Sequence, residues 1–133
     1  MNLYYLDTSA ALKLLAEESH SLEFAQFYDE HTDADWVSSA LLRIELVRAV
    51  TRTLPALLHG ARELLMAFDY LSIDDEIIEA AAGEPDRSLR SLDSIHLATA
   101  RVLGSDLTAI VTYDDRLAQA GQDAGMSIVS PRG

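Results

Sequence analysis

Apolar and polar residues follow two different spacings along this chain of 133 residues. Short apolar runs bounded by Asp, Ser, Gly or Pro are typical of buried strands, and apolar residues every three to four positions are typical of helices. The pattern predicts strands at residues 3–6, 35–39, 70–73, 107–112 and 127–130. It predicts helices at residues 10–18, 22–31, 40–54, 55–68, 75–84, 92–104 and 114–125.

The alternation of these strands and helices indicates the fold class. Strands that alternate with helices form right-handed β–α–β units, and such units build a mostly parallel sheet with helices on both faces. We therefore predict an α/β fold with a central sheet of about four to five strands. The chain length and the 49% share of hydrophobic residues suit one domain spanning residues 1–133.

Composition excludes several kinds of chemistry. Because the chain contains no cysteine, it has no disulfide framework, no thiolate nucleophile and no Cys-ligated zinc site. Any bound metal would be held by oxygen or imidazole ligands. No apolar run approaches the roughly 20 residues of a membrane span, and the N-terminus lacks a secretory signal pattern, so we expect a soluble, cytoplasmic protein with no membrane partner.

The formal net charge of −12 argues at first sight against a nucleic-acid partner, because phosphate contacts come from Lys and Arg. Two features offset this objection. Acids that bind divalent cations are neutralised by them, and nine of the ten basic residues are arginines, which can bind phosphate through two hydrogen bonds. The net charge alone therefore neither supports nor excludes a nucleic-acid partner.

Acidic residues follow predicted strands that lie far apart in the sequence. Asp7 comes directly after the first strand, and Asp114 and Asp115 follow the fourth. Asp93 lies in the first turn of its predicted helix, and Glu45 lies one to two turns into the helix after the second strand. Because ligands bind beyond the carboxyl ends of parallel strands, these acids can all be placed at one edge of the sheet.

Each of these acids, taken alone, also has a structural interpretation. A carboxylate after a strand can form an Asx turn, and one at the start of a helix can cap it or complement its dipole. Glu45 can belong to a solvated stripe with Arg48 and Arg52. Taken together, four acids from distant segments are better explained by a divalent cation site, since crowded carboxylates repel one another unless a cation lies between them. Oxygen ligands favour Mg²⁺ or Mn²⁺, and the chemistry indicated is hydrolysis of a phosphodiester.

Four short motifs carry a family resemblance. They are LDTSA (6–10), SSALLRIEL (38–46), LRSLDSIHLATA (89–100) and VTYDDRL (111–117). In this order they resemble the PIN-domain family, specifically the VapC-like toxic ribonucleases of bacterial type II toxin–antitoxin pairs, over residues 4–130. The resemblance implies a PIN-like fold in which the metal-binding and catalytic acids are Asp7, Glu45, Asp93 and Asp114. It leaves open whether Asp115 also binds metal or only caps the last helix.

The resemblance also implies supporting hydroxyl groups. Thr8, Ser9 and Thr112 match the family's small hydroxyl residues, and such side chains orient carboxylates or metal-bound water. The sequence itself adds two basic candidates, Arg87 and Arg90, in the loop before the third acid. We expect them to contact RNA phosphate, and a flexible surface loop is the alternative interpretation.

The remaining candidates are assigned more weakly. Arg43, Arg48 and Arg116 are lesser candidates for RNA contact. His96 lies one turn after Asp93, and within its apolar run we expect a packed histidine bonded to the backbone rather than a metal ligand. We expect the other conspicuous side chains to serve the surface, the core or a dimer interface, and they are Lys13, Trp36, Tyr4, Tyr5 and Phe24.

The resemblance implies a toxic endoribonuclease that uses one or two Mg²⁺ ions, with Mn²⁺ as a substitute. It also implies a homodimer and a VapB-type antitoxin whose C-terminal segment blocks the site. One alternative is a PIN nuclease of RNA processing, which the short chain without appended domains disfavours. Another is an acidic interaction module without catalysis, which the presence of all four acids disfavours. A phosphotransfer domain would need a lysine after a late strand, whereas the only lysine is Lys13.

Overall fold

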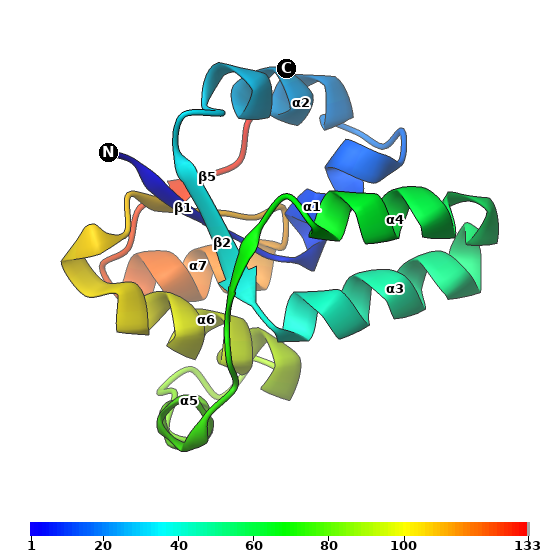
Figure 1. Cartoon of the computed structure of the whole chain (residues 1–133). Helices are drawn as coiled ribbons and strands as arrows, with labels where there is room; N and C mark the ends of the chain where they lie inside the picture. The colour runs from blue at the N-terminus through cyan, green and yellow to red at the C-terminus, as the bar shows by residue number, and fades with distance from the viewer. Residues whose placement is uncertain (133) are drawn as a thin grey trace.

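Five short strands form the centre of the protein in this computed structural model, which describes residues 1–132 (Figure 1). The strands are β1 (Leu3–Leu6), β2 (Asp35–Ser39), β3 (Asp69–Leu71), β4 (Ala109–Val111) and β5 (Ile128–Val129). The helices are α1 (Thr8–Leu15), α2 (Ser21–Glu30), α3 (Leu41–Thr53), α4 (Leu58–Leu65), α5 (Asp75–Ala82), α6 (Ser91–Leu103) and α7 (Asp115–Asp123). Two short 3-10 helices, Pro55–Leu57 and Gly104–Asp106, complete the elements.

The sheet is parallel throughout and has the strand order β3-β2-β1-β4-β5. The chain builds outward from β1 to β2 and β3, and then returns to place β4 on the other side of β1. Strand order therefore reverses between β1 and β4, which pair through Tyr5 with Ile110 and Leu6 with Val111. Ligand sites in open α/β sheets lie beyond the carboxyl ends of the strands at such a reversal.

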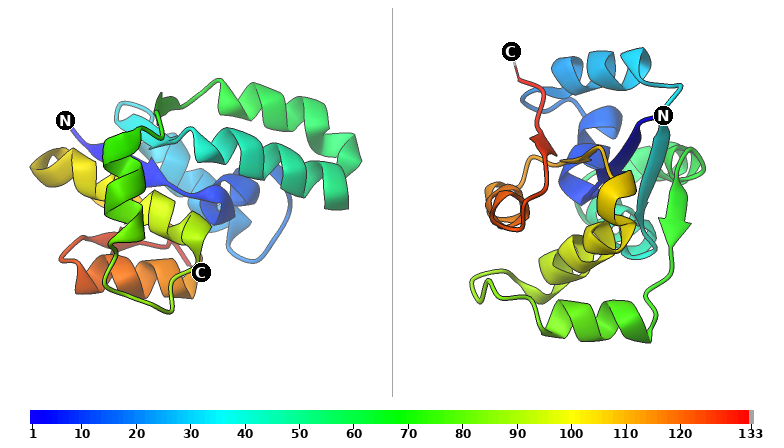
Figure 2. Two further views of the ribbon diagram at one scale, coloured as in Figure 1. Left: turned by 90° about the horizontal axis from the view of Figure 1, so that it is seen from below. Right: turned by 90° about the vertical axis from the view of Figure 1, so that its left-hand side faces the viewer.

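Helices cover both faces of the sheet (Figure 2). Successive residues of a strand point to opposite faces, so Tyr4 and Tyr5 enter different parts of the core. Tyr4 packs with α1 and α2, where its ring stacks on that of Trp36 at 4.9 Å between centroids. Tyr5 packs with α6 and α7 on the other face. The predicted α/β class with one parallel sheet is confirmed, and Trp36 lies in the core.

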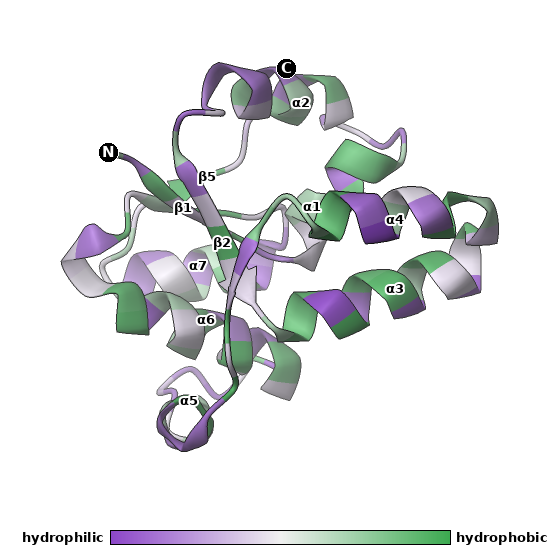
Figure 3. Ribbon diagram, viewed as in Figure 1, coloured by the Kyte–Doolittle hydropathy of each residue, from purple (hydrophilic) through white to green (hydrophobic). Residues whose placement is uncertain are grey.

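The element bounds differ from the predicted ones where local chemistry intervenes. Helix α1 begins at Thr8, two residues early, because the Asp7 side chain caps it. The predicted helix at 55–68 is divided, since Pro55 starts a 3-10 turn before α4 begins at Leu58. Polar and apolar residues alternate along α3 and α4, which project side by side from the sheet (Figure 3). No helix among residues 1–132 is long and apolar enough to span a membrane.

Gly104 ends α6 in a backbone conformation that a side chain disfavours. Its φ of 55° and ψ of −132° lie in a region that is almost restricted to glycine. We predict that Gly104→Ala lowers the free energy of unfolding by about 1–2 kcal/mol, measured by chemical denaturation. Gly83→Ala is the matched control, because Gly83 also ends a helix but has an ordinary φ of −95°. Equal effects of the two substitutions would contradict this prediction.

Candidate active site

Asp7 lies at the end of β1, where the strand order reverses, and it is almost fully buried. Its Oδ1 atom accepts hydrogen bonds from the Ser9 hydroxyl at 2.7 Å and from the Ala10 backbone N–H at 3.1 Å. Its Oδ2 atom accepts a hydrogen bond from the Thr112 hydroxyl at 2.8 Å. Burial raises the pKa of the Asp7 carboxyl, and these hydrogen bonds oppose the rise by stabilising the carboxylate.

Asp114 follows β4, the strand beside β1, and caps helix α7. Its Oδ1 atom accepts hydrogen bonds from the backbone N–H groups of Arg116 at 2.9 Å and Leu117 at 3.0 Å. Thr112 connects the two acids, because its hydroxyl donates to Asp7 and accepts from the Asp114 backbone N–H at 3.0 Å. Asp7 and Asp114 therefore each cap a helix and also lie at the same edge of the sheet. The capping interpretation and the shared-site interpretation do not exclude each other.

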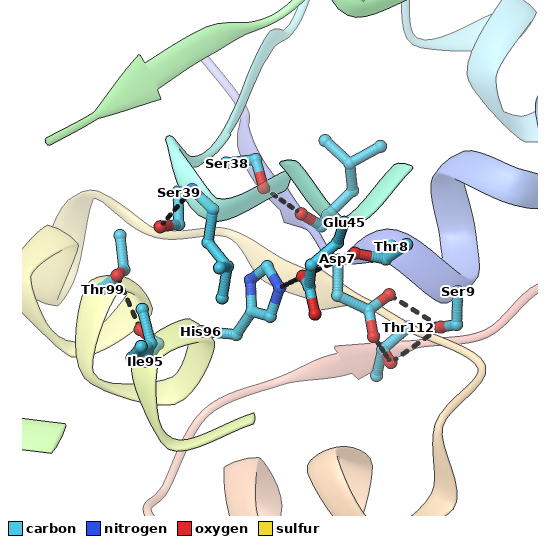
Figure 4. A network of polar contacts seen from close by, with 12 residues as sticks. Asp7, Thr8, Ser9, Ser38, Ser39, Glu45, Ile95, His96, Thr99 and Thr112 are labelled. Carbon is cyan, nitrogen blue, oxygen red and sulfur yellow. Dashed lines mark hydrogen bonds and ion pairs between the residues drawn. The ribbon is translucent and has the colours of Figure 1, made fainter. Parts of the chain in front are cut away.

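Glu45 reaches the same edge from helix α3 (Figure 4). Its Oε1 atom accepts hydrogen bonds from the Thr8 hydroxyl and from His96 Nε2, each at 2.7 Å. Burial alone would raise the pKa of Glu45, but the hydrogen bonds from His96 and Thr8 outweigh it, so the pKa lies below its usual value. Glu45 is thus held as a carboxylate, and the predicted alternative of a solvated arginine stripe does not describe its contacts.

Asp93 lies in the first turn of α6 and is half-buried. Burial raises the pKa of its carboxyl, and the negative charge of Asp114 raises it further. The charges of Asp7 and Glu45 act in the same direction. Since repulsion of this kind requires proximity, the four predicted acids share one electrostatic environment although they come from four elements.

The donor chemistry of this edge fits a hard divalent cation, because four carboxylates gather there and the imidazole beside them, His96, has both ring nitrogens occupied by Tyr5 and Glu45. Within residues 1–132, no three Asp, Glu or His side chains are grouped closely enough to enclose a metal ion by themselves. Mg²⁺ rarely requires such a cage, since it keeps several water ligands and binds through one or two carboxylates together with substrate oxygens. The repulsion at Asp93 is the observation that a cation would relieve.

An open pocket of about 360 Å³ lies beside Asp93 and Asp114. Arg90 and Arg116 also line it, together with Asp115, whose side chain is 97% exposed. Arg87 lines a separate, larger hollow of about 1040 Å³ between α5 and α6. Arg87 and Arg90, which were predicted together, therefore lie in different pockets. Arg116, a lesser candidate from the sequence, lines the same pocket as Arg90, Asp93 and Asp114.

The structure gives His96 a partner that differs from the predicted one, and it gives Tyr5 a hydrogen bond where only packing was predicted. His96 is buried as expected, but its ring nitrogens contact Glu45 and, at 2.6 Å, the Tyr5 hydroxyl. The prediction of a histidine bonded to the backbone is therefore wrong. The available signal was the spacing of three residues between Asp93 and His96, which places both near one face of α6.

Residues 4–122 match the family model of the PIN domain. The chain belongs to the PIN-domain family. It is 42% identical to ribonuclease VapC35 of Mycobacterium tuberculosis over 131 residues, which cover 97% of each chain. This identity over nearly the whole length confirms the resemblance to VapC-like PIN proteins that the four motifs indicated.

Solved PIN-like structures confirm the fold. The crystal structure of M. tuberculosis VapC20, described as a Sarcin-Ricin loop cleaving toxin, superimposes with a TM-score of 0.78 at 15% identity, covering 96% of this chain and 99% of that one. A toxin–antitoxin complex from Klebsiella pneumoniae includes a chain with a TM-score of 0.70 at 22% identity, with 98% of both chains covered. At these identities the likeness establishes a common fold.

The raised pKa of Asp93 generates a stability prediction. Folding disfavours its ionised form, so the wild type loses stability as the pH rises from the ordinary carboxyl pKa through the raised one. We predict that Asp93→Asn stabilises the metal-free protein by about 0.5 kcal/mol at pH 7, measured by urea unfolding with chelator present. Asp86→Asn is the control with opposite sign, because hydrogen bonds from Ser88 lower the pKa of Asp86. A loss of stability in Asp93→Asn would contradict the prediction.

Proposed function

We propose that this protein is a metal-dependent endoribonuclease and the toxin of a VapBC-type toxin–antitoxin pair. The observation that carries the proposal is the group of four carboxylates at the strand reversal, three of which repel the fourth, Asp93. Membership in the PIN-domain family and the 42% identity to a protein named as a ribonuclease also support the proposal. The proposed catalytic and metal-binding residues are Asp7, Glu45, Asp93 and Asp114.

These four residues would hold one or two Mg²⁺ or Mn²⁺ ions against a scissile phosphodiester. A divalent cation bound there polarises the phosphodiester and lowers the pKa of an attacking water. The Ser9 and Thr112 hydroxyls fix both oxygens of Asp7, and Thr8 fixes one oxygen of Glu45. These hydrogen bonds keep the carboxylates in place before any ligand arrives, which reduces the reorganisation needed on binding.

Arg90 and Arg116 are the proposed contacts for RNA phosphate. Both line the pocket beside the acids, and neither forms an ion pair with an acid within residues 1–132. Arginine binds phosphate through two parallel hydrogen bonds, so the two guanidinium groups that line the pocket can orient a phosphodiester. This local positive charge offsets the net charge of −12 where the substrate would approach.

The family also supports proposals about partners and location. We propose a VapB-type antitoxin as the protein partner, in line with the toxin–antitoxin complex whose fold this chain shares. Exposed apolar side chains on or beside the α3–α4 pair, at Ile44, Leu54 and Met66, offer contact area for a protein. We further propose a homodimer that acts in the cytoplasm. The alternatives, an RNA-processing nuclease and a non-catalytic module, differ from this proposal in target and in activity.

The activity prediction uses purified protein and a mixed pool of transfer and ribosomal RNA. We expect discrete fragments with Mg²⁺ or Mn²⁺ and none with chelator. Asp93→Asn should reduce the cleavage rate by about 100-fold or more, since metal polarisation contributes several kcal/mol to transition-state stability. Asp86→Asn should cleave at the wild-type rate, because Asp86 lies in the exposed loop before α6 and outside the acid group.

The result against this prediction is equal cleavage by wild type and Asp93→Asn, which would point to a contaminating nuclease. Absence of both cleavage and metal binding, the latter measured by calorimetry, would favour the non-catalytic module. Cleavage of precursor RNA alone, leaving mature transfer and ribosomal RNA intact, would favour the RNA-processing alternative.

The arginine prediction concerns affinity for RNA. In the Asp93→Asn background, where RNA stays intact, Arg90→Ala and Arg116→Ala should each weaken binding several-fold at moderate salt. Each should also reduce the slope of log affinity against log salt concentration by about 0.7, the value for one phosphate contact to single-stranded RNA. Arg62→Ala, an exposed arginine on α4, is the control. A loss with Arg62→Ala equal to the other two would mean that only overall charge matters.

A further inference from the structure

A chain of three hydrogen bonds, of which the first two are buried and the third is partly buried, ends on Glu45. The Ser39 backbone N–H donates to the Tyr5 hydroxyl oxygen at 3.2 Å. The Tyr5 hydroxyl contacts His96 Nδ1 at 2.6 Å, and His96 Nε2 contacts Glu45 Oε1 at 2.7 Å. Tyr5 and Ser39 are 0% exposed and His96 is 2% exposed, so the first two contacts are shielded from water. Glu45, at the end of the chain, has a side chain that is 19% exposed. The chain connects β2, β1, α6 and α3 in that order.

Donor and acceptor chemistry gives this chain one continuous direction when His96 is neutral and carries its proton on Nε2. A backbone N–H can only donate, so it occupies a lone pair of the Tyr5 oxygen. In that tautomer His96 Nδ1 is the acceptor, and the Tyr5 hydroxyl is the donor of their contact. A neutral imidazole that accepts at Nδ1 carries its own proton on Nε2, and that proton points at the carboxylate of Glu45.

We propose that Tyr5 and His96 are positioning residues that hold the Glu45 carboxylate in the orientation it needs to bind a divalent cation. The proposal rests on the function proposed above and adds two residues to it. Thr8 and His96 both donate to Oε1. With both donors on one oxygen, the orientation of the carboxylate is set and Oε2 is left for a ligand.

Packing alone does not account for these polar groups. Phe and Leu would fill the same space without a buried hydroxyl and imidazole that need partners. Tyr4 provides the internal comparison, because it is also buried on β1 and no hydrogen bond of its hydroxyl occurs within residues 1–132. Loss of the Tyr5 hydroxyl removes the donor that keeps Nδ1 unprotonated, and the other tautomer would turn a lone pair of Nε2 toward the carboxylate.

The first test measures Mn²⁺ affinity by calorimetry in wild type, Tyr5→Phe and Tyr4→Phe. Outer partners of metal ligands typically contribute about 10-fold to 100-fold in affinity, so we expect Tyr5→Phe to weaken binding by about 10-fold. Tyr4→Phe should stay within about twofold of wild type. A folded Tyr5→Phe protein that binds Mn²⁺ like the wild type would overturn the inference.

A double-mutant cycle separates positioning from a general loss of stability. The side-chain amide of His96→Gln can donate to Glu45 without help from Tyr5, so we expect this variant to keep most of the affinity. Tyr5→Phe should then cost less in the His96→Gln background than in wild type. Equal costs in both backgrounds would overturn the inference, and unfolding curves without metal show that each variant is folded.

The proton positions are testable without metal or activity. Nitrogen NMR of histidine-labelled protein reports which ring nitrogen carries the proton, and His96→Gln assigns the signal among the four histidines. We expect Nε2 protonated and Nδ1 unprotonated in wild type. A proton on Nδ1 would overturn the inference.

Failure of the proposed function gives a different result. Wild type would then bind no Mn²⁺, whereas failure of the inference alone leaves wild-type and Tyr5→Phe affinities equal and Asp93→Asn weaker.

Discussion

The parallel pairing of β1 with β4 is the constraint on which the candidate site depends. It places Leu6 beside Val111, so the residues that follow each strand meet at the same edge. The Thr112 hydroxyl can therefore donate to Asp7, 105 residues away in the chain. Helices α1 and α7 both start at this edge, and their N-termini favour the negative charges that gather there.

Helix capping and ligand binding use the same carboxylates in this protein. Asp7 and Asp114 each satisfy backbone N–H groups through Oδ1, so each contributes to folding. The Asp93 side chain has no hydrogen bond within residues 1–132 and is repelled by its neighbours. Asp93 thus bears a cost of assembling the acids that no capping hydrogen bond offsets, as expected of a group that functions with a cation beside it.

Sequence patterns predicted the parts of the site that follow from strand ends. Asp7 and Asp114 could be placed because each follows an apolar strand. The carboxyl ends of parallel strands meet at one edge of the sheet, where ligands bind. Glu45 and Asp93 lie within helices, so their placement at this edge depended on where those helices start, and the family motifs agreed with it. Alternation along β1 predicts that Tyr4 and Tyr5 face apart, but it carries no information about the partner of a hydroxyl group. That partner depends on how α6 packs on the sheet, which no local pattern encodes. The separation of Arg87 from Arg90 likewise depends on the path of a loop.

The unequal structural roles of the acids have a consequence for the evolution of this chain. Substitution of Asp7 or Asp114 removes a helix cap together with a ligand, so such variants risk degradation as unfolded protein. Substitution of Asp93 removes a ligand and relieves repulsion, so the product remains folded. Under selection against the proposed toxicity, variants that are inactive but still folded would arise mainly by substitution of Asp93. Such copies would keep the surfaces that partners bind and could compete with active protein for them.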